Sequence, residues 1–162
     1  MTPVKLNPNT HRSIIILIID LQKHKKEAEL LKYLAVYFSF LLSLIIIDLI
    51  WLLGIAKNIY RDDMGSLMAS EPKLLAGLGF YLLYALGTAI FVILPAISKQ
   101  SWIYAVQYGA LFGFFCYMTY DLTNLAVIRD FPIRLAFIDI AWGSAVTASS
   151  ATIAYWVGSR IA

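Results

Sequence analysis

Three aspartates, Asp48, Asp121 and Asp139, lie inside apolar stretches that are long enough to cross a bilayer. No lysine, arginine or histidine shares these stretches. A charged side chain at the centre of a membrane costs roughly 2.5 kcal/mol or more, so intramembrane acids usually mark a functional site or a contact that fixes a helical bundle. Because such carboxylates can exchange protons or bind cations, we expect the function to depend on these three side chains.

Tryptophan follows two of these acids at the same offset. Asp48 and Trp51 stand three residues apart, and so do Asp139 and Trp142. On a helix this spacing places the carboxylate and the indole on one face, where the indole N–H can donate a hydrogen bond. The third stretch adds Tyr117, Tyr120 and Asn124 near Asp121, and the second carries an uncharged polar stripe of Tyr81, Tyr84 and Thr88.

The composition is that of a membrane protein. Hydrophobic residues make up 60% of the 162 residues and charged residues only 14%, which is more apolar surface than a soluble core of this size could bury. The single Cys116 excludes a disulfide framework and a cysteine metal cluster. Both histidines, His11 and His24, precede the first apolar span. We therefore expect no metal, no cofactor and no nucleic-acid partner.

Four apolar segments, residues 33–56, 74–94, 102–128 and 135–158, meet the requirement of about 20 residues for a transmembrane helix. The connections are short, so sequential helices should be antiparallel neighbours. The sequence therefore predicts an all-α membrane protein with an up-and-down four-transmembrane-helix bundle. In the first connection, a short interfacial helix is predicted because its apolar residues fall on one helical face: Ile59, Tyr60, Met64, Leu67 and Met68.

Residues 1–31 form an extension before the transmembrane domain of residues 32–162. Its apolar run, residues 13–21, is too short to span a bilayer, and a basic cluster follows it. The extension is expected to be cytoplasmic, either lying on the membrane as a short amphipathic helix or partly disordered.

The distribution of lysine and arginine favours a cytoplasmic N-terminus. With the N-terminus inside, the inner segments hold eight of these residues and the outer loops five. The margin comes from the extension, because without residues 1–31 the counts are three and five and the orientation reverses. In either orientation, antiparallel helices place all three acids in the same half of the membrane, below loops that carry Lys57, Arg61, Arg129 and Arg134.

Small residues predict where helices pack closely. Gly109 and Gly113 form a GxxxG motif in the third span, of the kind that lets helix backbones approach in lipid. These residues are expected to pack within the bundle or between the protomers of a homo-oligomer, together with a small-residue face of the fourth span: Gly143, Ser144, Ala148, Ser149, Ala151 and Thr152.

Several segments resemble a known family. The run IDLIWLLGIAKNIYRDDMG, then GFYLLYALG, and above all YDLTNLA and IDIAWG are similar to a bacterial family of four-span membrane proteins called domain of unknown function 2177 (DUF2177). The resemblance covers residues from about 33 to 158. It implies four spans in a bacterial inner membrane and no established activity. It also implies a role for Asp48, Trp51, Tyr60, Tyr120, Asp121, Asn124, Asp139 and Trp142.

Two functional classes fit these residues. The first is a proton- or cation-coupled carrier or a channel-like subunit, with Asp48 and Asp139 as the exchanging pair and Asp121 and Asn124 as polar ligands. The second is a lipid-binding or lipid-modifying enzyme, or its accessory subunit, with paired carboxylates as acid and base. The predicted site comprises Asp48, Trp51, Tyr60, Arg61, Tyr117, Tyr120, Asp121, Asn124, Arg134, Asp139 and Trp142.

A purely structural role for the acids is the remaining alternative. Polar side chains in membrane helices often only bond neighbouring helices. On this interpretation Asp48 bonds a tyrosine, Asp139 pairs with Arg134, and Asp121 reaches Arg129.

Overall fold

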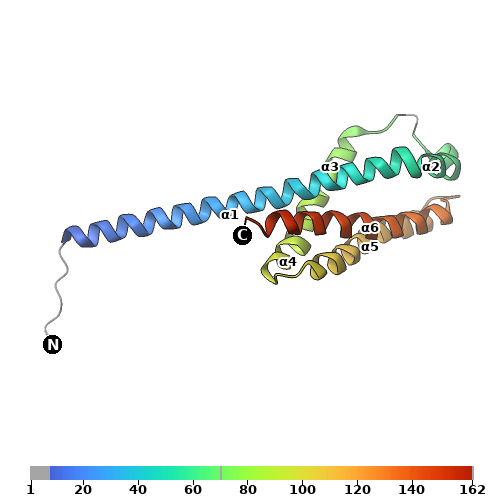
Figure 1. The fold of residues 1–162 in the computed structure, drawn as a ribbon. Coiled ribbons are helices and arrows are strands. Elements are labelled where there is room, and N and C mark those ends of the chain that lie inside the picture. Colours follow the sequence, from blue (N-terminus) through green and yellow to red (C-terminus); the bar gives the residue numbers. More distant parts are fainter. Residues whose placement is uncertain (1–7, 70, 162) are drawn as a thin grey trace.

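The computed structural model describes residues 8–69 and 71–161, and this part of the chain is helical with short connections and no strand. Figure 1 shows a long first helix alongside α6, which lies beside α5, with α3 passing obliquely across the helices. The elements in chain order are α1 (Pro8–Ile50), η1 (Trp51–Ile55), α2 (Lys57–Met64), η2 (Gly65–Leu67), α3 (Leu74–Thr88), η3 (Ala89–Ile93), α4 (Leu94–Ser98), α5 (Trp102–Val127) and α6 (Ile133–Gly158).

The first helix is far longer than a membrane is thick. α1 has 43 residues, or about 65 Å at 1.5 Å per residue. Its N-terminal part projects beyond the rest of the molecule (Figure 1), and the apolar side chains from Ile14 to Ile19 are exposed. The helix passes through residue 31 without a break. No change in secondary structure marks the predicted boundary between the extension and the transmembrane domain, so the position of this boundary remains a prediction.

Among the described residues, two helices are long and apolar enough to cross a membrane, Arg12–Ile55 and Leu74–Ser98. α5 and α6 have 26 residues each but do not meet the same criterion of length and hydropathy. Inward glycine, serine and threonine residues lower the mean hydropathy of α6, and tyrosine, glutamine and other polar residues lower that of α5. The predicted four-span bundle is therefore not confirmed, whereas its all-α class is.

From the sequence, the second apolar segment was predicted to end at residue 94, just before Pro95. In the structure the helix continues beyond this proline. Proline lacks an N–H and its ring clashes with the carbonyl four residues earlier in an α-helix. The preceding turn, η3, is a π-helix in which the N–H of Leu94 donates to the carbonyl of Ala89. This wider turn accommodates Pro95, so α4 continues to Ser98. The first apolar segment also ends in a π-helix, η1, where the N–H of Ala56 donates to the carbonyl of Trp51.

Close packing of α5 on α6 depends on glycine. A Cβ added at Gly113 would meet the backbone carbonyl of Gly143, and one at Gly109 would meet the Cα of Ala148 at 3.0 Å. Both glycines of the GxxxG motif thus face α6 of the same chain. A contact between protomers would have to use other residues of the small-residue face, such as the exposed Ser149. The homo-oligomer itself remains a prediction.

The core lies where α1, α3, η3 and α6 meet. The largest side chains that are completely buried there are Phe40, Leu44 and Ile93. α1 contributes at every fourth residue, since Val36, Phe40, Leu44 and Asp48 all lie on its buried face. This register brings the first aspartate into the interior of the bundle.

Candidate functional site

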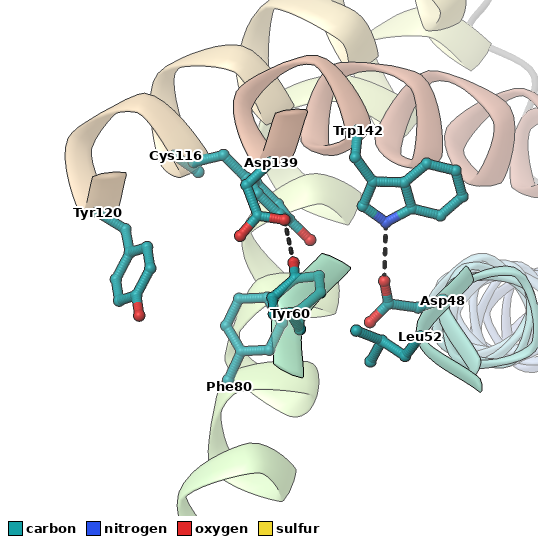
Figure 2. A pocket seen from close by; sticks show the side chains of 9 residues that line it. Asp48, Leu52, Tyr60, Phe80, Cys116, Tyr120, Asp139 and Trp142 are labelled. Carbon is teal, nitrogen blue, oxygen red and sulfur yellow. Dashed lines mark hydrogen bonds between the residues drawn. The ribbon is translucent and has the colours of Figure 1, made fainter. Parts of the chain in front are cut away.

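A pocket of about 430 Å³ is lined by residues of α1, η1, α2, α3, α5 and α6 (Figure 2). Figure 1 shows α2 beside α1 and α6 at this end of the bundle. Two of the three buried aspartates, Asp48 and Asp139, line the pocket from the first and last helices, and most of the other lining side chains are aromatic. The complete lining is Asp48, Leu52, Tyr60, Phe80, Cys116, Tyr117, Tyr120, Asp139 and Trp142.

Asp48 is held by two neutral donors from other helices. The Nε1 of Trp142 on α6 donates to its Oδ1 at 2.9 Å, and the hydroxyl of Tyr81 on α3 donates to its Oδ2 at 2.5 Å. Only 7% of the residue is exposed. This carboxylate therefore joins three helices, and the expected bond to a tyrosine is present.

The two tryptophans that follow the acids form one stack. The rings of Trp51 and Trp142 lie 4.3 Å apart between centroids, with planes 9° from parallel. Trp142 bonds the aspartate of the other helix, Asp48, and not the aspartate three residues before it. The Nε1 of Trp51 is buried and has no hydrogen-bond partner among the described residues. The shared spacing thus produces a contact between helices, with Trp51 behind Trp142 and outside the pocket lining.

Asp139 is held by α2. The hydroxyl of Tyr60 donates to its Oδ1, as Figure 2 shows. Burial, and then this hydrogen bond, raise the pKa of the Tyr60 hydroxyl far above its ordinary value. Tyr60 therefore remains a donor at any physiological pH, and α2, predicted as an interfacial helix, closes this end of the pocket.

Arg134 does not pair with Asp139. Its Nη1 lies 3.7 Å from the Oδ1 of Asp63 on α2, so it ties the start of α6 to that helix. Arg61 is exposed and pairs with its neighbour Asp62 at 3.2 Å. Neither predicted arginine lines the pocket, and the pairing of Asp139 with Arg134 is wrong.

Asp121 is the most buried of the three acids, with no exposed surface. Neither carboxylate oxygen has a hydrogen-bond partner among the described residues, and Arg129, the partner considered from the sequence, is exposed. Asp121 and the half-buried Asn124 both lie outside the pocket lining. Their predicted role beside the exchanging pair remains a prediction.

Six of the predicted site residues line the pocket together: Asp48, Tyr60, Tyr117, Tyr120, Asp139 and Trp142. The sequence interpretation missed Leu52, Phe80 and Cys116 in the lining and Tyr81 behind it. Tyr81 had a signal, because it belongs to the polar stripe of the second apolar segment. The other three had none, since an apolar or cysteine side chain in a long apolar helix gives no indication of which face it occupies.

The interior beyond the pocket is filled. The hydroxyl groups of Tyr84 and Thr147 bond each other at 2.7 Å, and Phe40 and Leu44 are completely buried beside them. The two most exposed residues of the pocket lining are Phe80 on α3 and Tyr120 on α5, at 43% and 55%. We therefore infer that the pocket has a lateral mouth between these two helices.

Residues 33–156 match the family described as predicted membrane protein (DUF2177). The chain belongs to this family. The matched segment contains every residue that lines the pocket and leaves most of the projecting part of α1 outside. This confirms the resemblance seen in the sequence and supports a membrane location. No curated protein and no solved structure matches the chain.

Proposed function

We propose that the protein is a proton- or cation-coupled carrier whose cation site is the pocket between Asp48 and Asp139. The observation that carries this proposal is the charge of the lining. It holds two carboxylates and no lysine, arginine or histidine, and the groups that bond the acids are the neutral hydroxyls of Tyr60 and Tyr81 and the indole of Trp142. A carboxylate that ionises there attracts a proton or a cation, because no side chain of the lining balances it.

The membrane arrangement that suits this function has four spans, formed by α1, by α3 with α4, by α5 and by α6. At 26 residues each, α5 and α6 are about 39 Å long and exceed the hydrocarbon thickness of about 30 Å. Large apolar side chains are exposed on both, including Leu111, Phe115, Phe137 and Ile153. In this arrangement the protein is a multi-pass protein of a bacterial inner membrane with a cytoplasmic N-terminus.

A carrier suits the pocket better than an open channel does. A channel requires a continuous passage, whereas Tyr84, Thr147 and Leu44 fill the interior beyond the acids. A carrier exposes a site to one side at a time and changes conformation between the two states. The π-helical turn η1 lies beside the pocket, and the π-helical turn η3 lies just before Pro95. Such turns often occur at functional sites.

Transport in liposomes tests the proposal. Purified protein is reconstituted, a proton, sodium or potassium gradient is imposed, and an internal dye reports the flux. We expect flux with the wild type and loss of at least tenfold with Asp48→Asn or Asp139→Asn. Asp62→Asn is the matched control, because Asp62 is an exposed acid on α2. The absence of flux with every ion, or equal flux in all four proteins, would contradict a carrier.

The lateral mouth favours a second candidate, a lipid-binding or lipid-modifying protein. A pocket that opens between Phe80 and Tyr120 faces the acyl region in a four-span arrangement, so a lipid could enter from the side. This function predicts that a lipid stays with the purified protein and is lost when Tyr120→Trp narrows the mouth. Native mass spectrometry measures the retained lipid, and equal occupancy in the two proteins would exclude a lipid in this pocket.

A further inference from the structure

The pocket has the size of an organic ligand. Its volume of about 430 Å³ falls within the range of roughly 300–1,000 Å³ that is typical of small-molecule sites, whereas a water molecule occupies about 30 Å³ in the liquid. No group of three or more His, Cys, Asp or Glu side chains capable of holding a metal ion occurs among the described residues. A bare inorganic ion would leave most of this space without a partner.

Aromatic rings form most of the pocket wall. Five of the nine lining residues are aromatic, namely Tyr60, Phe80, Tyr117, Tyr120 and Trp142. The face of an aromatic ring attracts a cation within about 6 Å of its centroid, tryptophan most strongly, and aromatic cages of this kind recognise quaternary ammonium groups. A combination of rings with carboxylates suits a cation that has apolar substituents.

Hydrogen bonds and stacking fix several of these rings in place. The indole N–H of Trp142 is directed to Asp48 and the hydroxyl of Tyr60 to Asp139 (Figure 2). Trp51 covers one face of Trp142, so the pocket meets the part of the indole that Trp51 leaves uncovered. The ring of Tyr117 packs over Gly143, where a Cβ would collide with it. The wall is therefore preorganised, which lowers the cost of binding.

From these observations we infer that the pocket binds an alkylammonium group, with Asp48 and Asp139 as its counter-charges and the aromatic rings around its carbon substituents. This inference rests on the proposed function for the location of the cation site and adds the chemical class of the cation. Entry is lateral, past Tyr120, so the ammonium group belongs either to a free organic cation that partitions into the membrane or to the amine headgroup of a lipid.

Tryptophan fluorescence provides a direct test of binding. The chain has four tryptophans, so the variant Trp102→Phe/Trp156→Phe leaves only the stacked pair of Trp51 and Trp142. In nanodiscs of phosphatidylglycerol, tetraethylammonium chloride is titrated at constant ionic strength. We expect a saturable change in emission with tetraethylammonium and none with sodium or potassium. No saturable change, or the same change with potassium, would overturn the inference.

Two sets of variants locate the site. In this background, Asp48→Asn/Asp139→Asn should raise the apparent dissociation constant at least tenfold, whereas Asp62→Asn should leave it unchanged. Tyr120→Leu should weaken binding severalfold and Tyr120→Phe should restore it, because only the ring is required. Tyr120 is largely exposed, so these two variants keep the test valid if an acid variant fails to fold. Equal affinity in all variants would place binding elsewhere and overturn the inference.

Lipid composition separates the two sources of the ammonium group. If the lipid headgroup is the ligand, phosphatidylethanolamine in the nanodisc competes and raises the apparent dissociation constant of tetraethylammonium. If a free cation is the ligand, that constant does not change. Liposome flux separates this inference from the proposed function. Ammonium binding without flux of any ion contradicts the carrier alone, whereas proton flux without an ammonium response contradicts the alkylammonium site alone.

Discussion

The helix pair α5 and α6 has two halves that use opposite kinds of residue. In one half, which we call the closed half, Gly109 and Gly113 of α5 face small residues of α6, namely Gly143, Thr147, Ala148 and Ala151. In the other, the pocket half, α5 contributes Cys116, Tyr117 and Tyr120 and α6 contributes Asp139 and Trp142. The closed half is filled, and the pocket half encloses about 430 Å³.

The two halves have different roles: the small residues fix the positions of the helices, and the large polar side chains line the pocket. Small residues let two backbones approach until their carbonyl and Cα atoms touch, which fixes the relative position of the helices. Large polar side chains then converge at the end of helices that are already held. Asp48 and Asp139 come from helices at opposite ends of the chain, and they line one pocket because α1 packs against α6 through buried side chains such as Phe40 and Val146.

The largest expected effect follows from enlarging a glycine of the closed half. A Cβ at Gly113 already meets the carbonyl of Gly143 and lies 2.5 Å from the Oγ1 of Thr147. Gly113→Leu should therefore force α5 away from α6 and lower the free energy of unfolding by more than about 3 kcal/mol. Unfolding by increasing mole fractions of SDS in mixed micelles measures the change.

Gly77→Leu is the matched control for that substitution. Gly77 is also helical, but a Cβ there meets nothing within 4 Å. Its replacement should leave stability unchanged or raise it by about 0.5–1 kcal/mol through helix propensity. If both variants lose the same stability, close approach of α5 and α6 is not what holds the bundle, and the division into two halves fails.

Much of the closed half could be predicted from the sequence, because GxxxG and a run of small residues have one physical use in a membrane. The pocket half was predicted in its acids and in Tyr60, Tyr117, Tyr120 and Trp142, since polar groups in apolar helices stand out. Apart from the bond of Asp48 to a tyrosine, the hydrogen-bond partners of the acids were not predicted. Trp142 bonds Asp48 across the bundle, and which helix a side chain meets depends on the rotation of each helix about its axis.

Other errors also come from information that local sequence lacks. Pro95 predicted the end of a helix, but a π-helical turn absorbs it, and the choice depends on the packing of η3 against α5 and α6. From the sequence, Arg134 was paired with Asp139, but in the folded chain α2 places Asp63 beside Arg134. Phe80 could not be assigned, because an apolar side chain in a long apolar helix does not indicate which face it occupies.

Two buried acids, Asp48 in the pocket lining and Asp121 outside it, sharpen the comparison next. Asp48 accepts two hydrogen bonds, whereas Asp121 accepts none among the described residues. Asp48→Asn should lower the free energy of unfolding by about 1.5–3 kcal/mol. Trp142 and Tyr81 each donate to one carboxylate oxygen, and the substitution turns one of these oxygens into an NH2 group that cannot accept. Asp121→Asn replaces a buried carboxyl group without breaking a hydrogen bond to a described residue, so stability should not fall. SDS unfolding of the two variants at pH 7 measures both values.

The outcome for Asp121 decides what this residue does. Unchanged or increased stability identifies an acid that the fold does not require, and a simultaneous loss of ion flux would show that it contributes to function from outside the pocket lining. A loss of stability equal to that of Asp48→Asn would mean that Asp121 has a structural role. The pocket half would then contain structural acids as well as ligand-binding ones.

The smallest effect concerns the bond between α2 and the pocket, and it depends on pH. Tyr60→Phe removes one hydrogen bond to Asp139 and should lower the free energy of unfolding by about 1 kcal/mol below pH 10. The pKa of Tyr60 is raised in the folded protein, so only the unfolded tyrosine ionises above its ordinary pKa of about 10. The difference in free energy of unfolding between the wild type and Tyr60→Phe should then shrink by up to about 1.4 kcal/mol per pH unit and vanish near pH 11.

Unfolding curves of both proteins from pH 8 to 11 measure this difference. The contributions of the other tyrosines cancel because both proteins contain them. A difference that stays constant to pH 11 would mean that Tyr60 titrates normally, and α2 would then be a loose connector and not the closed end of the pocket.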